Sequence, residues 1–160
     1  MPAVAISVFC WQNPEFFLSD FALPNDAVGN RLAYAISWMI IPAAMLLAGV
    51  FGASRRGFYG DAIEGTRSPK SHSLEINLRY NQNTVEQALI AVIVWAGLAI
   101  ELPFEKLVII PILAALFAVG RVTFWVGYLV NPMARTFGMT LTVFPTLIGI
   151  FWLLMNKFIG

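Results

Sequence analysis

The order of hydrophobic and polar residues along the chain predicts four membrane-spanning helices. Four predominantly apolar stretches occupy about residues 31–53, 74–100, 104–129 and 135–156. A helix needs about 20 such residues to cross a bilayer, and each stretch has that length. We therefore expect an all-α integral membrane protein built as a four-helix bundle.

Polar residues in the second stretch are predicted to lie at membrane depth. Its fully apolar part, residues 88–100, is too short to cross a bilayer by itself. The preceding polar segment, residues 79–87, must therefore enter the membrane region as well. In the third stretch we expect Pro111 to kink the helix, and Pro132 after Asn131 to end it.

Residues 1–30 are predicted to form an extramembrane or interfacial segment. The segment lacks the positive charges with which a secretory signal peptide begins. Trp11, Phe16 and Phe17 suit the level of the lipid headgroups, where aromatic side chains gather. We expect the four-helix domain to occupy residues 31–160.

The composition agrees with a membrane protein and excludes several kinds of site. The chain of 160 residues is 59% hydrophobic and 12% charged, whereas soluble domains average about 25% charged residues. A net charge of +1 gives no footprint for nucleic acid. Cys10 is the only cysteine, so it excludes an intrachain disulfide. His72 is the only histidine. A zinc site and a catalytic nucleophile–histidine–acid arrangement are therefore not expected.

The distribution of positive charge predicts an orientation in the membrane. The loop of residues 54–73 shares one side with five basic residues: Arg55, Arg56, Arg67, Lys70 and Arg135. The other side carries Arg31, Lys106 and Lys157. Because positive residues favour the cytoplasmic side, we expect the loop there and both termini on the opposite side.

One polar stripe makes a pocket for a charged ligand the first functional hypothesis. Arg79, Asn83 and Glu86 are spaced by four and three residues, and Glu75 extends the series by one turn. Such spacings place side chains on one face of a helix. Ionisable groups are costly near lipid, so the polar stripe should face the protein interior or a wet cavity. The alternative is a structural network of polar contacts between helices.

A second set of residues lies on the third predicted helix and the link after it. Arg121, Phe124 and Tyr128 share one helical face by the same spacing rule. Arg135 should open the fourth helix and lie at the mouth of any pocket. The alternative interpretations are an interhelical ion pair from Arg121 to Glu86 or Glu75, and a membrane anchor at Arg135. The pair Arg55 and Arg56, taken alone, is a topology signal.

Several motifs in order resemble the MAPEG proteins, whose name stands for membrane-associated proteins in eicosanoid and glutathione metabolism. The resemblance covers about residues 31–158. It is carried by the pattern of residues 79–86 after Glu75, by residues 54–58 and 120–122, and by Tyr128-Leu129 with Arg135 seven residues beyond the tyrosine.

The resemblance implies a four-helix protomer, a homotrimer, and glutathione bound in a polar cleft between neighbouring subunits. By position, Arg79, Asn83 and Glu86 would contact glutathione from the second helix, and Arg121 and Tyr128 from the third. Arg135 would hold the glutathione thiolate, and Arg55 or Arg56 would close the cleft from the first helix. Phe124 stands where some enzymes of the family have a tyrosine.

The chemistry of glutathione fits these residue types. Arg79 and Arg121 suit its carboxylates, Glu86 suits its ammonium group, and Asn83 can serve either polarity. An arginine cannot accept a proton, so Arg135 would stabilise the thiolate electrostatically while water takes the proton.

We therefore expect a glutathione-dependent transferase or peroxidase acting on a lipophilic electrophile that enters from the bilayer. A member of another class, a non-catalytic lipid-binding or scaffolding protein of the same fold, is the main alternative. A small transporter is less favoured, because the chain has no detectable internal repeat.

Overall fold

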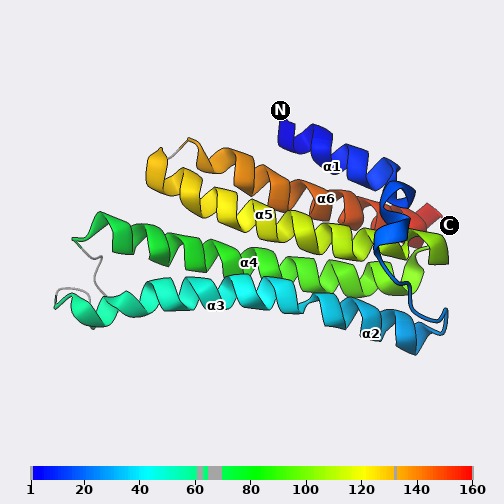
Figure 1. Cartoon of the computed structure of the whole chain (residues 1–160), viewed down its shortest axis with the longest axis horizontal. Coiled ribbons are helices and arrows are strands. Elements are labelled where there is room, and N and C mark those ends of the chain that lie inside the picture. Colours follow the sequence, from blue (N-terminus) through cyan, green and yellow to red (C-terminus); the bar gives the residue numbers. More distant parts are fainter. Residues whose placement is uncertain (1, 61–62, 65–69, 132, 160) are drawn as a thin grey trace.

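The computed structural model describes residues 2–60, 63–64, 70–131 and 133–159. Its helices run along the long axis of the molecule and form a bundle (Figure 1). Within the described ranges, four helical segments are long and apolar enough to cross a membrane: Val28–Phe58, His72–Glu101, Phe104–Val130 and Arg135–Ile159. The prediction of an all-α protein with four membrane-spanning segments is thus confirmed.

The first spanning segment consists of two helices rather than one. It begins with α2 (Val28–Trp38), continues as α3 (Ile40–Ser54) and ends in the short 3-10 turn η2 (Arg55–Phe58). Pro42 explains the break at Met39, because a proline has no N–H to donate and its ring crowds the carbonyl four residues earlier. The predicted segment, residues 31–53, has the right location, but it was expected to be one unbroken span.

The second spanning segment is the single long helix α4 (His72–Glu101). Ser71 caps its start, since the Ser71 hydroxyl accepts a hydrogen bond from the Leu74 backbone N–H at 3.5 Å. Pro103, two residues after Glu101, follows its end. His72 was expected in the preceding loop; it opens α4 instead and is exposed.

The third and fourth segments run antiparallel at one side of the bundle (Figure 1). The 3-10 turn η3 (Phe104–Val108) leads into α5 (Ile109–Val130), and α6 (Arg135–Ile159) follows. The expected kink at Pro111 is wrong, because Pro111 lies in the first turn of α5, where backbone N–H groups have no helical partner. Arg135 is the first residue of α6, as predicted.

Glycines allow α5 and α6 to pack closely. A Cβ atom at Gly138 would lie 2.5 Å from the Gly120 carbonyl oxygen and 2.6 Å from the Phe124 Cα. No real side chain fits at these distances, so the two helices touch through their backbones. This contact brings the polar side chains of α5 within reach of those of α6.

The N-terminal segment folds against the bundle. The short apolar helix α1 (Pro2–Gln12) lies beside α6 (Figure 1), and the 3-10 turn η1 (Pro14–Asp20) follows it. The Trp11 indole N–H donates a hydrogen bond to the Pro145 carbonyl at 3.0 Å. Ala3 and Ser7 of α1 are buried. The extramembrane or interfacial location of residues 1–30 stays a prediction.

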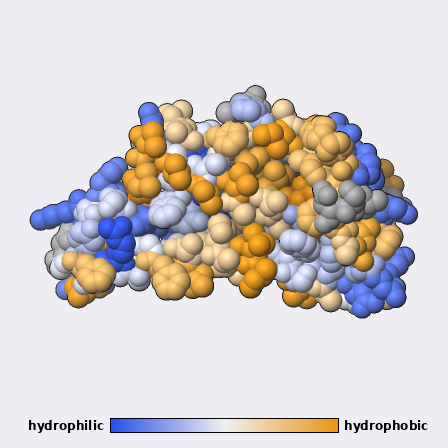
Figure 2. All heavy atoms as spheres, viewed as in Figure 1, coloured by the Kyte–Doolittle hydropathy of each residue, from blue (hydrophilic) through white to orange (hydrophobic). Residues whose placement is uncertain are grey.

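The apolar core occupies the half of the bundle near the end of α4 and the start of α5. Trp95, Leu98, Ile110, Leu113 and Phe117 are among its buried members. On the visible face, hydrophobic side chains cover most of the middle of the molecule and hydrophilic ones gather at its two ends (Figure 2). Such a pattern is typical of a protein whose middle lies in lipid.

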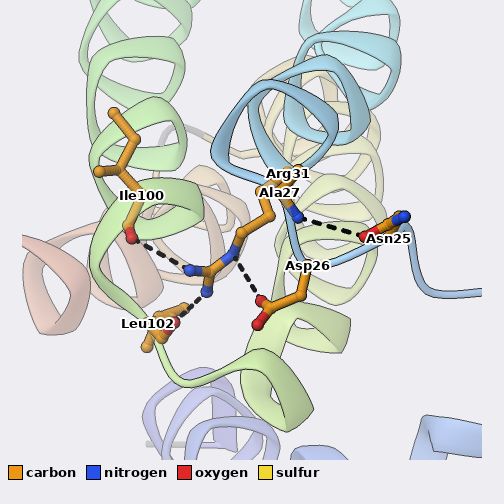
Figure 3. A network of polar contacts seen from close by, with 6 residues as sticks. All are labelled: Asn25, Asp26, Ala27, Arg31, Ile100 and Leu102. Carbon is orange, nitrogen blue, oxygen red and sulfur yellow. Dashed lines mark hydrogen bonds and ion pairs between the residues drawn. The ribbon is translucent and has the colours of Figure 1, made fainter.

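At the end of the bundle that holds the apolar core, Arg31 of α2 forms hydrogen bonds with the end of α4 (Figure 3). Its guanidinium donates to the backbone carbonyl oxygens of Ile100, at 3.3 Å, and of Leu102. Asp26 lies 3.8 Å from the Arg31 Nε atom. A helix leaves its last carbonyls without partners, and a cation there is favourable. Arg31, counted above only as a topology signal, therefore caps α4.

Candidate functional site

A polar cleft of about 390 Å³ opens where α4 faces the junction of α5 and α6. It lies at the opposite end of these helices from the apolar core. Three helices supply its lining: Arg79, Gln82, Asn83 and Glu86 from α4, Phe124 and Tyr128 from α5, and Arg135, Thr136 and Met139 from α6. The structure thus brings together five of the predicted site residues in one chain: Arg79, Asn83, Glu86, Tyr128 and Arg135.

The α4 wall of the cleft carries two charged groups that contact their own helix. Arg79 Nη2 lies 2.7 Å from a carboxylate oxygen of Glu75, and the Arg79 side chain is 61% exposed. The Gln82 side-chain amide donates to Glu86 at 2.9 Å. Both pairs join residues four apart, the spacing at which helical side chains meet. The polar stripe therefore lies on one face of α4, as its spacing predicted.

Arg121 lies behind this wall, outside the cleft lining, and its side chain is fully buried. Its Nη1 atom donates to Asn83 Oδ1 at 2.6 Å. Its Nε and Nη2 atoms donate to the Thr142 hydroxyl at 3.2 and 3.1 Å. The alternative for Arg121, an ion pair with Glu86 or Glu75, is not what the structure shows, because its hydrogen bonds go to Asn83, Thr142 and the Met139 sulfur. Arg121 would therefore support a ligand through Asn83 rather than contact it.

Two arginines and two aromatic rings form a stacked column along α5. The Arg121 guanidinium carbon lies 4.6 Å from the centre of the Phe124 ring. The Phe124 and Tyr128 rings are stacked with centres 5.9 Å apart. The Arg135 guanidinium carbon lies 4.5 Å from the centre of the Tyr128 ring. Cations favour the faces of aromatic rings, so the column holds Arg135 at the edge of the cleft.

Arg135 has no carboxylate partner in the described part of the chain, and the ion pairs Arg31–Asp26 and Arg79–Glu75 do not include it. It is also the first residue of α6, where the helix dipole adds about half a positive charge. A positive field of this kind attracts an anion and lowers the pKa of a thiol placed beside it.

Arg55 and Arg56 lie in η2, outside the cleft lining of their own chain. The preceding helix, α3, packs on α4 near Asn77 and Tyr80, whose atoms approach Gly52 and Gly49. Arg55 is close to Tyr59, which lies just outside the first spanning segment. The pKa of the Tyr59 hydroxyl is lowered, first by a hydrogen bond with Ser71 and also by the charge of Arg55. One chain alone does not bring these two arginines to the cleft.

Comparison with known proteins agrees with the helices and the motifs. Residues 30–155 match the MAPEG family. The chain belongs to the MAPEG family. The match covers most of each spanning segment and every residue that lines the cleft. The resemblance inferred from the motifs is thus confirmed, whereas the roles it implies for single residues stay predictions.

Two curated relatives of this MAPEG chain are transmembrane proteins. It is 28% identical to mouse Transmembrane protein 79 over 144 residues, which cover 86% of this chain and 36% of that protein. It is 28% identical to the bovine Transmembrane protein 79 over 137 residues, covering 81% of this chain and 34% of that protein. The chain thus spans about a third of the length of these relatives. No solved structure matches it.

Sequence reasoning missed four residues of the MAPEG site: Gln82, Thr136 and Met139 in the lining, and Thr142 behind it. The signal for the first three was available. Gln82 lies three residues after Arg79, Met139 lies four residues after Arg135, and Thr136 lies three residues before Met139. Thr142 gave no such signal, because its place beside Arg121 depends on the close contact of α5 and α6.

Proposed function

We propose that the cleft binds glutathione and holds its thiol as a thiolate that attacks a lipophilic electrophile from the bilayer. The protein would then be a membrane-bound glutathione transferase or peroxidase. The observation that carries this proposal is Arg135, a cation stacked on Tyr128 at the cleft edge without a carboxylate partner in the described ranges.

The charges of the cleft suit a ligand that is itself of mixed charge. Arg79 offers a guanidinium to a ligand carboxylate, and Glu86 offers a carboxylate to an ammonium group. Glutathione carries both kinds of group and a thiol. With its charged groups held on α4, its sulfur would lie toward Arg135 on α6.

The chemistry requires a proton acceptor other than arginine. The thiol proton passes to water, and the positive field of Arg135 stabilises the sulfur anion left behind. In a transferase reaction the sulfur forms a bond to an electrophilic carbon, whose leaving group departs with the electron pair or whose double bond accepts it. In a peroxidase reaction the sulfur attacks a peroxide oxygen, the O–O bond breaks, and the departing alkoxide takes a proton from water. The thiol of a second glutathione then attacks the sulfur of the resulting sulfenic acid, which forms a disulfide and releases water.

We further propose a homotrimer in which Arg55 or Arg56 of a neighbouring subunit closes the cleft. Both residues lie in η2, which meets the same end of the bundle as the α5–α6 junction (Figure 1). In the predicted orientation, with the loop of residues 54–73 cytoplasmic, the cleft opens toward the cytoplasm and water-soluble glutathione can enter there.

Calorimetry with the detergent-purified protein tests this function. We expect glutathione to bind and the complex at neutral pH to show the near-ultraviolet absorption of a thiolate. S-methylglutathione, which lacks the thiol, should bind without that absorption. Arg135→Ala should lose most of the absorption while retaining much of the affinity. If a folded wild-type protein fails to bind glutathione, the proposal is wrong.

One observation favours a second candidate, a non-catalytic lipid-binding or scaffolding protein. Arg79 already pairs with Glu75, and Glu86 already accepts from Gln82, so part of the polar stripe is satisfied without a ligand. A protein that purifies with phospholipid, shows no heat of binding with glutathione and is equally stable with and without it would support this candidate.

A further inference from the structure

The buried residues behind the cleft form a hydrogen-bond network with one direction. Thr142 has a single hydroxyl proton, and the hydroxyl donates to the Gly138 carbonyl at 2.9 Å. Its oxygen therefore faces Arg121 with lone pairs and accepts from Nε and Nη2. We call these residues the Arg121 network: Gly138, Thr142, Arg121 and Asn83. At its α6 end the direction of the hydrogen bonds is fixed, because the Thr142 hydroxyl donates to Gly138 and accepts from Arg121.

The orientation of the Asn83 amide follows from the same chemistry. An arginine has donors only, so the Asn83 atom 2.6 Å from Arg121 Nη1 must be the carbonyl oxygen. The amide nitrogen then points away from Arg121. Asn83 lines the cleft, and within the described residues its nitrogen has no hydrogen-bond partner. A donor is left for whatever occupies the cleft.

Arg121 also carries a fully buried charge whose partners, in the described part of the chain, are neutral: Asn83, Thr142 and the Met139 sulfur. A buried charge without a counter-ion is costly. An anionic atom bound to the Asn83 nitrogen would lie one amide away from that charge and partly neutralise it. A ligand ammonium at the same place would be repelled.

We propose that Arg121 and Thr142 are positioning residues that make Asn83 a hydrogen-bond donor for a carboxylate of the ligand. Asn83, which by residue type alone serves either polarity, thereby selects an anionic acceptor. The identity of the ligand as glutathione rests on the proposed function, whereas the polarity of Asn83 does not.

A pair of probes of equal length and opposite charge tests the polarity of Asn83 separately from the binding of glutathione. Glutarate carries two carboxylates, and 1,5-diaminopentane carries two ammonium groups on the same carbon chain. Their dissociation constants for the detergent-purified full chain can be obtained from the shift of the apparent Tm with probe concentration. We expect the wild-type protein to prefer glutarate.

The decisive variant is Asn83→Asp, which keeps an acceptor for Arg121 but removes the donor and supplies the missing counter-ion. We expect it to fold and to lower the preference for glutarate on the order of tenfold, the scale of a hydrogen bond to a charged group. Gln87→Glu is the matched control. It adds the same charge four residues along α4 and outside the cleft lining, so the preference should stay within about twofold of wild type.

The role of Thr142 is tested by Thr142→Val, which keeps the shape but removes the acceptor for Arg121. We expect the preference for glutarate to fall about threefold, and Thr142→Ser, which keeps the hydroxyl, to restore it. A lower Tm in Thr142→Val with unchanged preference for glutarate would mean that Thr142 is a structural residue and does not position Arg121.

A wild type that prefers the diamine or binds neither probe, or an Asn83→Asp protein with unchanged preference, would overturn the whole inference. If glutathione fails to bind but these preferences hold, only the proposed function falls.

Discussion

The residues of the cleft are organised around arginines that differ in how their charge is satisfied. Arg79 has a carboxylate beside it, whereas within the described ranges Arg121 has neutral acceptors and Arg135 has the face of a ring. Phe124 stacks between Arg121 and Tyr128. It therefore keeps the aromatic part of the site although it lacks the hydroxyl that a tyrosine would add. These contacts predict that ring faces, as well as charges, control the position of Arg135.

Replacing Tyr128 tests this control. Tyr128→Phe keeps the ring, so we expect the thiolate absorption of the glutathione complex and the turnover to stay within about twofold of wild type. Tyr128→Leu removes the ring face, which is worth about 0.5–2 kcal/mol to a nearby cation. It should lower both quantities about two- to thirtyfold, measured by ultraviolet absorption and by conjugation of a model electrophile. Equal losses in the two variants would instead assign the effect to the hydroxyl.

Individual residues differed in how far the sequence predicted them. Arg79, Asn83 and Glu86 were found because helical spacing within one element fixes which side chains share a face. The role of Arg121 could not be found that way, because its partners Asn83 and Thr142 lie on two other helices. Which side chain meets which across a helix interface depends on rotation and distance that the pattern of one helix does not contain.

The helices are joined by contacts of two kinds. Backbone contact through Gly120 and Gly138 joins α5 to α6 beside the cleft. At the other end Arg31 joins α2 to the end of α4 by hydrogen bonds to carbonyl oxygens. The location and polarity of the four spanning segments were predictable, but the break at Met39 and the place of Pro111 in the first turn of α5 were not. A proline limits the backbone on both sides of itself, and tertiary packing decides whether it begins, breaks or bends a helix.

Gly138→Ala should separate α5 from α6. Its new methyl group has no space beside the Gly120 carbonyl and the Phe124 backbone, so we expect a loss of about 1–3 kcal/mol in stability and weaker glutathione binding. Gly29→Ala is the control, because a Cβ there meets no atom within 4 Å and alanine favours a helix. It should leave the apparent Tm unchanged or raise it. A Gly138→Ala protein as stable as Gly29→Ala would contradict the close contact.

Arg31→Gln should weaken the core end of the bundle without changing the cleft. The variant leaves carbonyl oxygens at the end of α4 without a charged donor, and we expect a loss of about 1–3 kcal/mol in stability. Lys106→Gln removes a charge from an exposed side chain of η3, at the same end of the bundle, and should be nearly neutral. Thermal unfolding in detergent, together with glutathione affinity, measures both effects. A drop in affinity without a drop in apparent Tm would refute the capping role.

At the scale of the whole molecule, the bundle separates stability from candidate function. Buried apolar side chains fill the half where α4 ends and α5 begins, and the cleft occupies the half where α5 meets α6. The sequence predicted this separation for α4 alone, where the polar residues 79–87 precede the apolar residues 88–100. Arg55 and Arg56 stay outside the cleft lining of the single chain, and the proposed trimer would bring those of a neighbouring subunit to it.

Mixing of inactive subunits tests the proposed trimer. Arg79 and Arg135 line one cleft of one chain, so mixing Arg79→Ala subunits with Arg135→Ala subunits should restore no activity: each subunit carries one defect in its own cleft.

Mixing the double variant of Arg55 and Arg56 to alanine with Arg135→Ala should restore activity. There, an intact Arg135 in one subunit can meet intact arginines of η2 from its neighbour. If each cleft meets one neighbour and subunits assort equally, one cleft in four has this arrangement, so recovery should reach about a quarter of wild-type turnover. Recovery in the first mixture would mean that Arg79 and Arg135 of one site come from different chains, which contradicts the cleft lining of the single chain. A protein that remains monomeric in mild detergent and binds one glutathione per chain would exclude a cleft shared between subunits. Both mixtures contain the Arg135→Ala subunit. The other subunit loses one arginine of α4 in the first mixture and two arginines of η2 in the second, so the mixture that loses more charge is the one expected to recover. The contrast between them therefore depends on which chain supplies each side chain rather than on the loss of charge.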